Sequence, residues 1–356
     1  MSTRRDFLTQ SSATVLLFAA SRDNTRAINS TAYAKMTLRK IPRTNLTVSR
    51  LAFGCAMLGW DWNSPDFVAR TVPVIRTAYD QGITFFDLAD VYGNGGSEAA
   101  MRLALKESTG LRRRLVIQSK CGDRFKDGST IDNSREHILT SVEGSLRRLG
   151  TDYLDILLLH WPDSLVRPEE VANAFDKLKH SGKVRYFGVS NHSPAQYELL
   201  QKYVRQPLIA NQIQLGLMHW YLIPRGIKPS WVHADEGVAT VDYCRLHDIW
   251  VQAYSPLSAD DIASPPNVFN PPADAPAEVQ ELAQLLADLA KKYEANRAAI
   301  ILAWLLRHPA GITPIIGTTK AQHLVDDCVA DRIELTREEW YSLLAAAAKV
   351  RFPSAT

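Results

Sequence analysis

Short apolar segments alternate with longer helix-like segments along the chain from residue 37 onward. The apolar segments are mostly continuous, which is typical of parallel strands that are covered on both faces. We expect strands at a segment that ends near Gly54 and at 84–87, 115–119, 154–159, 186–190, 209–213, 250–254 and 313–317. We expect helices at 68–81, 135–149, 168–180, 194–203, 235–247, 279–293, 297–307 and 321–329, one that Ser97 caps, and one from Thr336. Eight such repeats favour a closed barrel over an open doubly wound sheet.

The predicted fold is therefore an α/β (β/α)8 TIM barrel with an N-terminal β-hairpin cap at 38–54 and an additional C-terminal helix. No domain boundary interrupts the pattern, so residues 36–356 are expected to form one barrel domain. An aromatic-rich segment at 216–236 and a proline-rich segment at 258–276 interrupt the repeat. Both segments follow strands, which predicts that they lie on the rim where barrels carry their chemistry.

The overall composition argues against several classes of partner. The 41 basic and 38 acidic residues of the 356-residue chain include no basic block, so no nucleic-acid partner is expected. The cysteines stand far apart without a C-x-x-C pair, which predicts neither a metal site nor a redox dithiol. No apolar stretch approaches the length of about 18 residues that a membrane-spanning helix requires, so stable membrane insertion is not expected.

The N-terminal segment, residues 1–35, resembles a twin-arginine export signal. Arg4 and Arg5 precede a short apolar run at 13–20, and Ala32-Tyr33-Ala34 offers a small-x-small cleavage site. This pattern predicts a leader, export to a periplasm and the twin-arginine export machinery as a partner. The alternative is a disordered tail on a cytoplasmic protein, which the shortness of the apolar run favours.

Four polar side chains stand at or just beyond the ends of three successive strands: Asp87, Tyr92, Lys120 and His160. The carboxyl ends of barrel strands meet at one rim, so these side chains are expected to converge. A tyrosine beside a lysine and a histidine, with an aspartate that holds the lysine, is typical of a proton-donating site. The turn Gly93-Asn94-Gly95-Gly96 is expected to let the backbone turn tightly beside Tyr92.

Lys120 has several interpretations. It can be a Schiff-base nucleophile, as in an aldolase, a binder of phosphate or carboxylate, or a cation that lowers the pKa of Tyr92. Asp87 would keep Lys120 charged, which is unsuitable for a Schiff-base lysine. A structural ion pair is a further alternative. His160 is either a structural side chain or a neutral imidazole that orients a carbonyl group.

Seven motifs, in order along the chain, resemble those of the aldo-keto reductase family: FFDLADVYG, VIQSKCG, DILLLHWPD, GKVRYFGVSNHS, NQIQ, AYSPLS and PIIGTTK. The resemblance implies a nicotinamide-dependent reductase of aldehydes or ketones on a (β/α)8 barrel. Tyr92 would be its general acid, Lys120 and Asp87 the pair that tunes it, and His160 the residue that orients the carbonyl. The rival functions are a non-catalytic cofactor-binding sensor or partner subunit, and a Schiff-base aldolase.

The resemblance also implies where the cofactor binds. Ser190, Asn191 and Gln212 would hold the nicotinamide carboxamide, and Tyr254 would stack under the ring. The segments expected to wrap the phosphates are Ser255, Pro256, Leu257 and Ser258, and then Gly317, Thr318, Thr319 and Lys320. His323 and Asp327 take the positions near the adenosine. Lys320 favours NADP(H), while the weaker cation at His323 and the carboxylates Asp326 and Asp327 leave NAD(H) possible.

The substrate pocket is expected beside His160. Trp60 and Trp62, in the loop after the first strand, and Trp161 would line it together with the aromatic segment 216–236. Aromatic side chains near one polar cluster predict a small-molecule carbonyl substrate with an apolar or sugar-like body.

Overall fold

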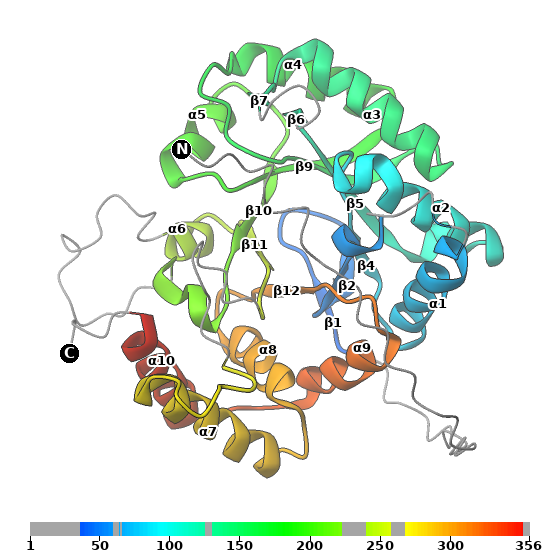
Figure 1. Cartoon of the computed structure of the whole chain (residues 1–356). Helices are drawn as coiled ribbons and strands as arrows, with labels where there is room; N and C mark the ends of the chain where they lie inside the picture. Colours follow the sequence, from blue (N-terminus) through cyan, green and yellow to red (C-terminus); the bar gives the residue numbers. More distant parts are fainter. Residues whose placement is uncertain are drawn as a thin grey trace, which may run out of the picture. The chain divides into compact units, whose positions relative to one another are not determined.

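Eight parallel strands form a closed barrel at the centre of the molecule. The computed structural model describes residues 36–59, 64, 66–124, 130–222, 240–257 and 268–351. The strands pair in the order β10-β11-β12-β3-β4-β5-β8-β9, and helices surround them (Figure 1). Their bounds are β3 (Ala52–Gly54), β4 (Phe85–Asp87), β5 (Val116–Cys121), β8 (Leu154–Leu159), β9 (Val184–Ser190), β10 (Leu208–Gln214), β11 (Trp250–Tyr254) and β12 (Thr313–Ile316). The predicted (β/α)8 barrel is confirmed. The predicted leader, residues 1–35, lies outside the described residues.

The helices follow the sequence prediction closely. They are α1 (Phe67–Asp80), α2 (Gly96–Glu107), α3 (Arg135–Leu149), α4 (Pro168–His180), α5 (Pro194–Gln201), α6 (Thr240–Leu246), α7 (Ala277–Lys292), α8 (Arg297–Arg307), α9 (Ala321–Cys328) and α10 (Arg337–Arg351). Ser134 caps α3 and a Ser193–Gln196 capping box starts α5, as helix starts generally require. The expected cap at Ser97 is wrong: α2 begins one residue earlier, after Gly95 in the left-handed conformation.

A two-stranded hairpin closes the N-terminal end of the barrel. β1 (Leu38–Lys40) pairs antiparallel with β2 (Thr47–Ser49). Ile41 and Val48 of this hairpin are fully buried in one cluster with Phe85 and Trp250, which occupy the barrel interior. The hairpin therefore seals the end of the barrel opposite the predicted site.

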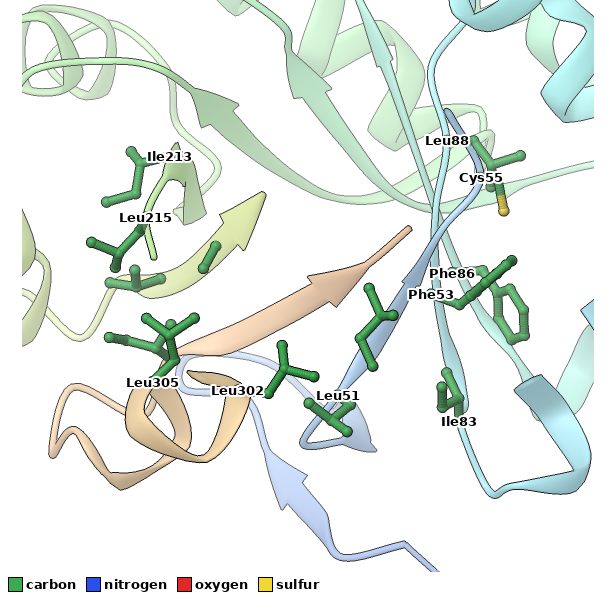
Figure 2. Close-up of a cluster of buried hydrophobic side chains, with 14 of the residues drawn as sticks. Leu51, Phe53, Cys55, Ile83, Phe86, Leu88, Ile213, Leu215, Leu302 and Leu305 are labelled. Atoms are coloured by element: carbon green, nitrogen blue, oxygen red, sulfur yellow. The ribbon is translucent and has the colours of Figure 1, made fainter. Parts of the chain in front are cut away.

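Neighbouring residues of each strand pack on opposite faces. Phe85 belongs to the interior cluster, whereas Phe86 belongs to the larger core between strands and helices. In that outer core, Leu302 and Leu305 of α8 face residues at the strands, Leu302 on the side of Leu51 and Leu305 on the side of Leu215 (Figure 2). Because side chains alternate along a strand, every second residue of the strands points into the barrel.

Two features differ from the sequence prediction. A small antiparallel hairpin, β6 (Asp123–Arg124) with β7 (Thr130–Ile131), follows β5. In the segment 216–236, the described part forms a 3-10 helix, Leu217–Leu222, whose Trp220 is buried in the outer core. Within the described ranges, no helix is long and apolar enough to cross a membrane, and no cluster of side chains could hold a metal ion.

Candidate active site

The ends of β4, β5 and β8 bring the predicted catalytic residues together. β4 and β5 are neighbours in the barrel, and Asp87 pairs with Gln118 in their register. β5 and β8 are the next neighbours, with Lys120 opposite Leu158. Asp87, Gln118 and Lys120 are thus held on adjacent strands. His160 follows the last residue of β8, and its backbone amide donates to the Cys121 carbonyl, 2.9 Å away.

Lys120 joins the Asp87 carboxylate to the Tyr92 phenol. Its Nζ lies 2.7 Å from Asp87 Oδ2 and 3.1 Å from Tyr92 OH, and it also donates to the Leu88 carbonyl at 3.0 Å. Burial alone would lower the pKa of Lys120, but Asp87 and Tyr92 outweigh it and the net shift is upward. Lys120 is therefore a charged hydrogen-bond donor. That state opposes the aldolase alternative, in which the amine must be neutral.

Tyr92 is held as an acid. Burial raises its pKa, Lys120 lowers it and Asp87 raises it, with a net shift upward from the ordinary value. Lys120 therefore lowers the pKa of Tyr92, as predicted, but burial is the larger effect and the net shift is upward. A phenol that stays protonated at neutral pH suits proton donation.

The backbone after Tyr92 turns tightly, as predicted from its glycines. Gly93 and Asn94 both take left-handed conformations, with φ of 56° and 55°. A Cβ atom on Gly93 would lie only 2.0 Å from the Gly59 carbonyl oxygen, so no larger residue fits at this position.

His160 presents a neutral ring beside Tyr92. Burial, and then the charge of Lys120, hold its pKa well below the ordinary value. The His160 ring meets the Tyr92 ring edge-on at 5.6 Å between centroids, and the Trp161 ring stacks on it at 5.9 Å. His160 Nδ1 has no partner among the described residues. A neutral imidazole in this place can donate one N–H to a carbonyl oxygen.

Two glutamines donate to the second oxygen of the Asp87 carboxylate, and a third glutamine binds both of them. Asp87 Oδ1 accepts hydrogen bonds from Gln118 Nε2 at 2.6 Å and Gln212 Nε2 at 2.9 Å. Gln252 lies behind both, with its Oε1 2.8 and 2.9 Å from the same two nitrogens. Gln118 and Gln252 were missed in the sequence. The available signal was a polar residue at an inward position of an otherwise apolar strand.

The predicted nicotinamide residues form one connected group. Tyr254 OH lies 2.9 Å from Asn191 Oδ1, and Asn191 Nδ2 donates to the His160 carbonyl and Ser190 Oγ. Ser190 Oγ in turn donates to the Gln212 carbonyl at 2.9 Å. The structure therefore connects Ser190, Asn191, Gln212 and Tyr254 to the group of Asp87, Tyr92, Lys120 and His160, here called the tetrad. Both hydrogens of Gln212 Nε2 are already committed, so only its Oε1 is left to accept from a ligand amide.

A cavity of about 580 Å³ lies between the segment after β11, the start of α8 and the start of α9. It is lined by Leu257, Phe269, Asn270, Asn296, Arg297, Ala298, Gly317, Thr318, His323 and Asp327. Five of these were predicted as cofactor residues. Asn296 and Arg297 were missed, because the start of α8 lies far along the chain from both cofactor motifs.

The remaining predicted residues fall on the same rim or outside the described residues. Ser255 has a left-handed backbone, with φ of 47°, and Pro256 next to it is buried. Thr319 and Lys320 are exposed at the start of α9, where Thr318 Oγ1 accepts from the Lys320 amide at 3.1 Å. Trp161 is partly exposed. Trp60, Trp62 and Ser258 lie outside the described residues.

A buried carboxylate–lysine–phenol group and a cavity of about 580 Å³, both at strand ends of a (β/α)8 barrel, suit a barrel oxidoreductase. The model of the aldo/keto reductase family matches residues 50–347, and the chain belongs to that family. It is therefore an oxidoreductase that reduces carbonyl groups with a nicotinamide cofactor. The lining of the cavity fits such a cofactor, because the Arg297 guanidinium and the backbone amides at the start of α9 favour phosphate.

Three known proteins illustrate the similarity. The chain is 35% identical over 310 residues to the uncharacterized oxidoreductase YcsN of Bacillus subtilis, covering 85% of this chain and 95% of that one. It is 32% identical over 309 residues to a 6-dehydroglucose reductase of Agrobacterium fabrum, with coverage of 85% and 95%. The solved glycerol dehydrogenase AKR11B4 of Gluconobacter oxydans superposes with a TM-score of 0.72 at 26% identity, covering 90% and 97%.

Proposed function

We propose that Tyr92 is the general acid of this reductase and that Lys120, Asp87 and His160 assist it. The observation that carries the proposal is the position of Lys120 Nζ, 2.7 Å from Asp87 Oδ2 and 3.1 Å from Tyr92 OH. His160 donates an N–H to the substrate carbonyl oxygen, and Tyr92 gives that oxygen its proton. Lys120 stabilises the negative charge that this transfer leaves on the phenol oxygen. The bound nicotinamide supplies the hydride.

The function is tested by cofactor oxidation with a panel of aldehydes and ketones. We propose a small carbonyl substrate whose body packs on Trp161, since this side chain stacks beside His160. The panel includes sugar-derived carbonyls, because a relative is named 6-dehydroglucose reductase. Turnover of the panel supports the catalytic role. Its absence in cofactor-loaded protein would favour the sensor alternative.

We also propose that NADP(H) is preferred over NAD(H). Arg297 and His323 line the adenosine end of the cavity, and Lys320 lies at the start of α9. Asp326 and Asp327 oppose these cations, although Asn296 Nδ2 donates to Asp327 Oδ1 at 3.2 Å. The fixed cations Arg297 and Lys320 favour an extra phosphate.

Replacing Arg297 with alanine should reduce the preference for NADPH. We expect kcat/KM for NADPH to fall about tenfold, because one charged hydrogen bond to phosphate is lost, while the value for NADH changes little. His323→Arg should act in the opposite direction by adding a fixed cation. Steady-state kinetics with both cofactors gives the ratio. Equal losses for NADPH and NADH in Arg297→Ala would contradict a 2′-phosphate role.

The pH dependence of carbonyl reduction follows from the site. The pKa of His160 is lowered and those of Tyr92 and Lys120 are raised, so none of the three titrates between about pH 7 and 9. Reduction needs protonated Tyr92. The protein should therefore be active at neutral pH and lose activity as the pH rises through the raised pKa of Tyr92. We expect kcat at saturating cofactor to stay level over that range. A fall in kcat as the pH is lowered below 7, with a midpoint near pH 6.5 where ordinary histidines titrate, would contradict a neutral His160.

A further inference from the structure

A layer of buried amides separates the catalytic residues from the apolar filling of the barrel. Gln118, Gln212 and Gln252 are each at most 1% exposed. Gln118 is the register neighbour of Asp87 on β4 and β5, and Gln212 is the neighbour of Gln252 on β10 and β11. These two strand pairs stand apart in the strand order, so the hydrogen bonds between them cross the barrel.

The direction of every amide in this layer is fixed by chemistry. An ionised carboxylate only accepts hydrogen bonds, so the Nε2 atoms of Gln118 and Gln212 must face Asp87 Oδ1. The second hydrogen of each nitrogen then goes to Gln252 Oε1. Gln252 Nε2 returns a hydrogen bond to Gln118 Oε1 at 2.9 Å. Gln252 thus fixes the orientation of the side-chain amides of Gln118 and Gln212, the two glutamines that donate to Asp87.

Stability alone does not require this arrangement. Deeper in the barrel, Phe85, Trp250 and Ile315 fill the interior with apolar groups. Buried polar networks are generally no more stabilising than well-packed apolar side chains of similar volume. The amides stand only at the level of Asp87, where they contact the catalytic carboxylate.

We propose that Gln118 and Gln252 are positioning residues of the reductase. They hold Asp87 Oδ1 so that Asp87 Oδ2 keeps Lys120 Nζ within reach of Tyr92 OH. The inference rests on the proposed role of Tyr92 as the acid. It adds that the rate depends on residues that touch neither substrate nor cofactor. Gln212 links the same layer to the cofactor face, since its Oε1 is the atom left for a ligand.

Two substitutions at Gln252 test the proposal. Gln252→Leu removes the acceptor shared by Gln118 and Gln212, and we expect kcat to fall about tenfold or more with little change in carbonyl KM. Gln252→Glu is more specific. Its protonated acid reproduces the amide, whereas its ionised form places a second anion near Asp87. We therefore expect kcat close to that of the unmodified protein at acidic pH and a new loss of kcat as the pH rises.

Thr313→Val is the matched control. Thr313 is fully buried on β12, where it is the register neighbour of Gln252 on β11, and it accepts a hydrogen bond from Trp250 Nε1 at 2.8 Å. The valine removes one buried hydrogen bond without contacting Asp87. We expect a comparable loss of thermal stability, kcat within about twofold and an unchanged pH profile. Circular dichroism at each pH confines the comparison to folded protein.

The outcomes are distinct. The positioning role is overturned if Gln252→Leu lowers kcat no more than Thr313→Val, or if folded Gln252→Glu keeps the original pH profile. If Gln252→Leu does not fold, Gln118→Met provides the second apolar substitution. The pH dependence of kcat in Gln252→Glu, which is folded at least at acidic pH, then remains as the other test. These results leave the acid role of Tyr92 untouched. That role fails separately if Tyr92→Phe remains active.

Discussion

Tyr92→Phe should reduce carbonyl turnover about a thousandfold while the protein still folds and binds its cofactor. The substitution removes only the hydroxyl, which lies 3.1 Å from Lys120 Nζ. General acid catalysis contributes about 10²- to 10⁴-fold to such reactions, and no other described hydroxyl bonds to Lys120 Nζ. The measurement is kcat for the best carbonyl of the panel, together with cofactor binding followed by fluorescence.

Tyr153→Phe is the control for this substitution. The Tyr153 ring lies between Arg112 and Arg185, 3.8 Å from each guanidinium, and phenylalanine keeps that ring. We expect its kcat to match that of the unmodified protein within about twofold. A Tyr92→Phe protein that retains more than about a tenth of the activity would require another proton donor.

Lys120→Met should have the second-largest effect, on both rate and stability. Lys120 is the group that lowers the pKa of Tyr92, so its loss leaves burial and Asp87, both of which raise it. The proton is then harder to transfer, and we expect kcat to fall about a hundredfold. The substitution also leaves Asp87 buried without its cation. Breaking such a pair costs about 3 kcal/mol of unfolding free energy, measurable by urea denaturation.

A surface lysine provides the comparison. Lys183 pairs with Glu143, but its side chain is 37% exposed, so Lys183→Met should change stability by less than about 1 kcal/mol and leave kcat unchanged. If Lys120→Met behaved like Lys183→Met in both measurements, the pair of Lys120 and Asp87 would have no catalytic role.

The sequence predicted the barrel and the tetrad because both depend on where strands end. Asp87, Lys120 and His160 each mark the end of an apolar run, and parallel topology brings such ends together. The amide layer could not be predicted in this way. Gln118 and Gln252 are 134 residues apart along the chain, and their contact depends on which strands face each other across the closed barrel.

Two further points depended on three-dimensional surroundings. The net direction of the Tyr92 pKa shift reflects burial, which a sequence does not quantify, against the charge of Lys120. Arg297 lines the cavity from the start of α8, whereas the predicted cofactor segments follow β11 and precede α9. Its position follows from packing between consecutive helices and not from any local pattern.

The contact between Gly59 and Gly93 limits how the site can change during evolution. A Cβ atom on Gly59 would lie 2.3 Å from the Ser97 amide nitrogen, and one on Gly93 would lie 2.0 Å from the Gly59 carbonyl oxygen. The loop that leaves β3 and the loop that carries Tyr92 are therefore pressed together, backbone against backbone. Any side chain gained at either glycine would force the two backbones apart and shift the Tyr92 phenol, so neither position can vary while the phenol keeps its place.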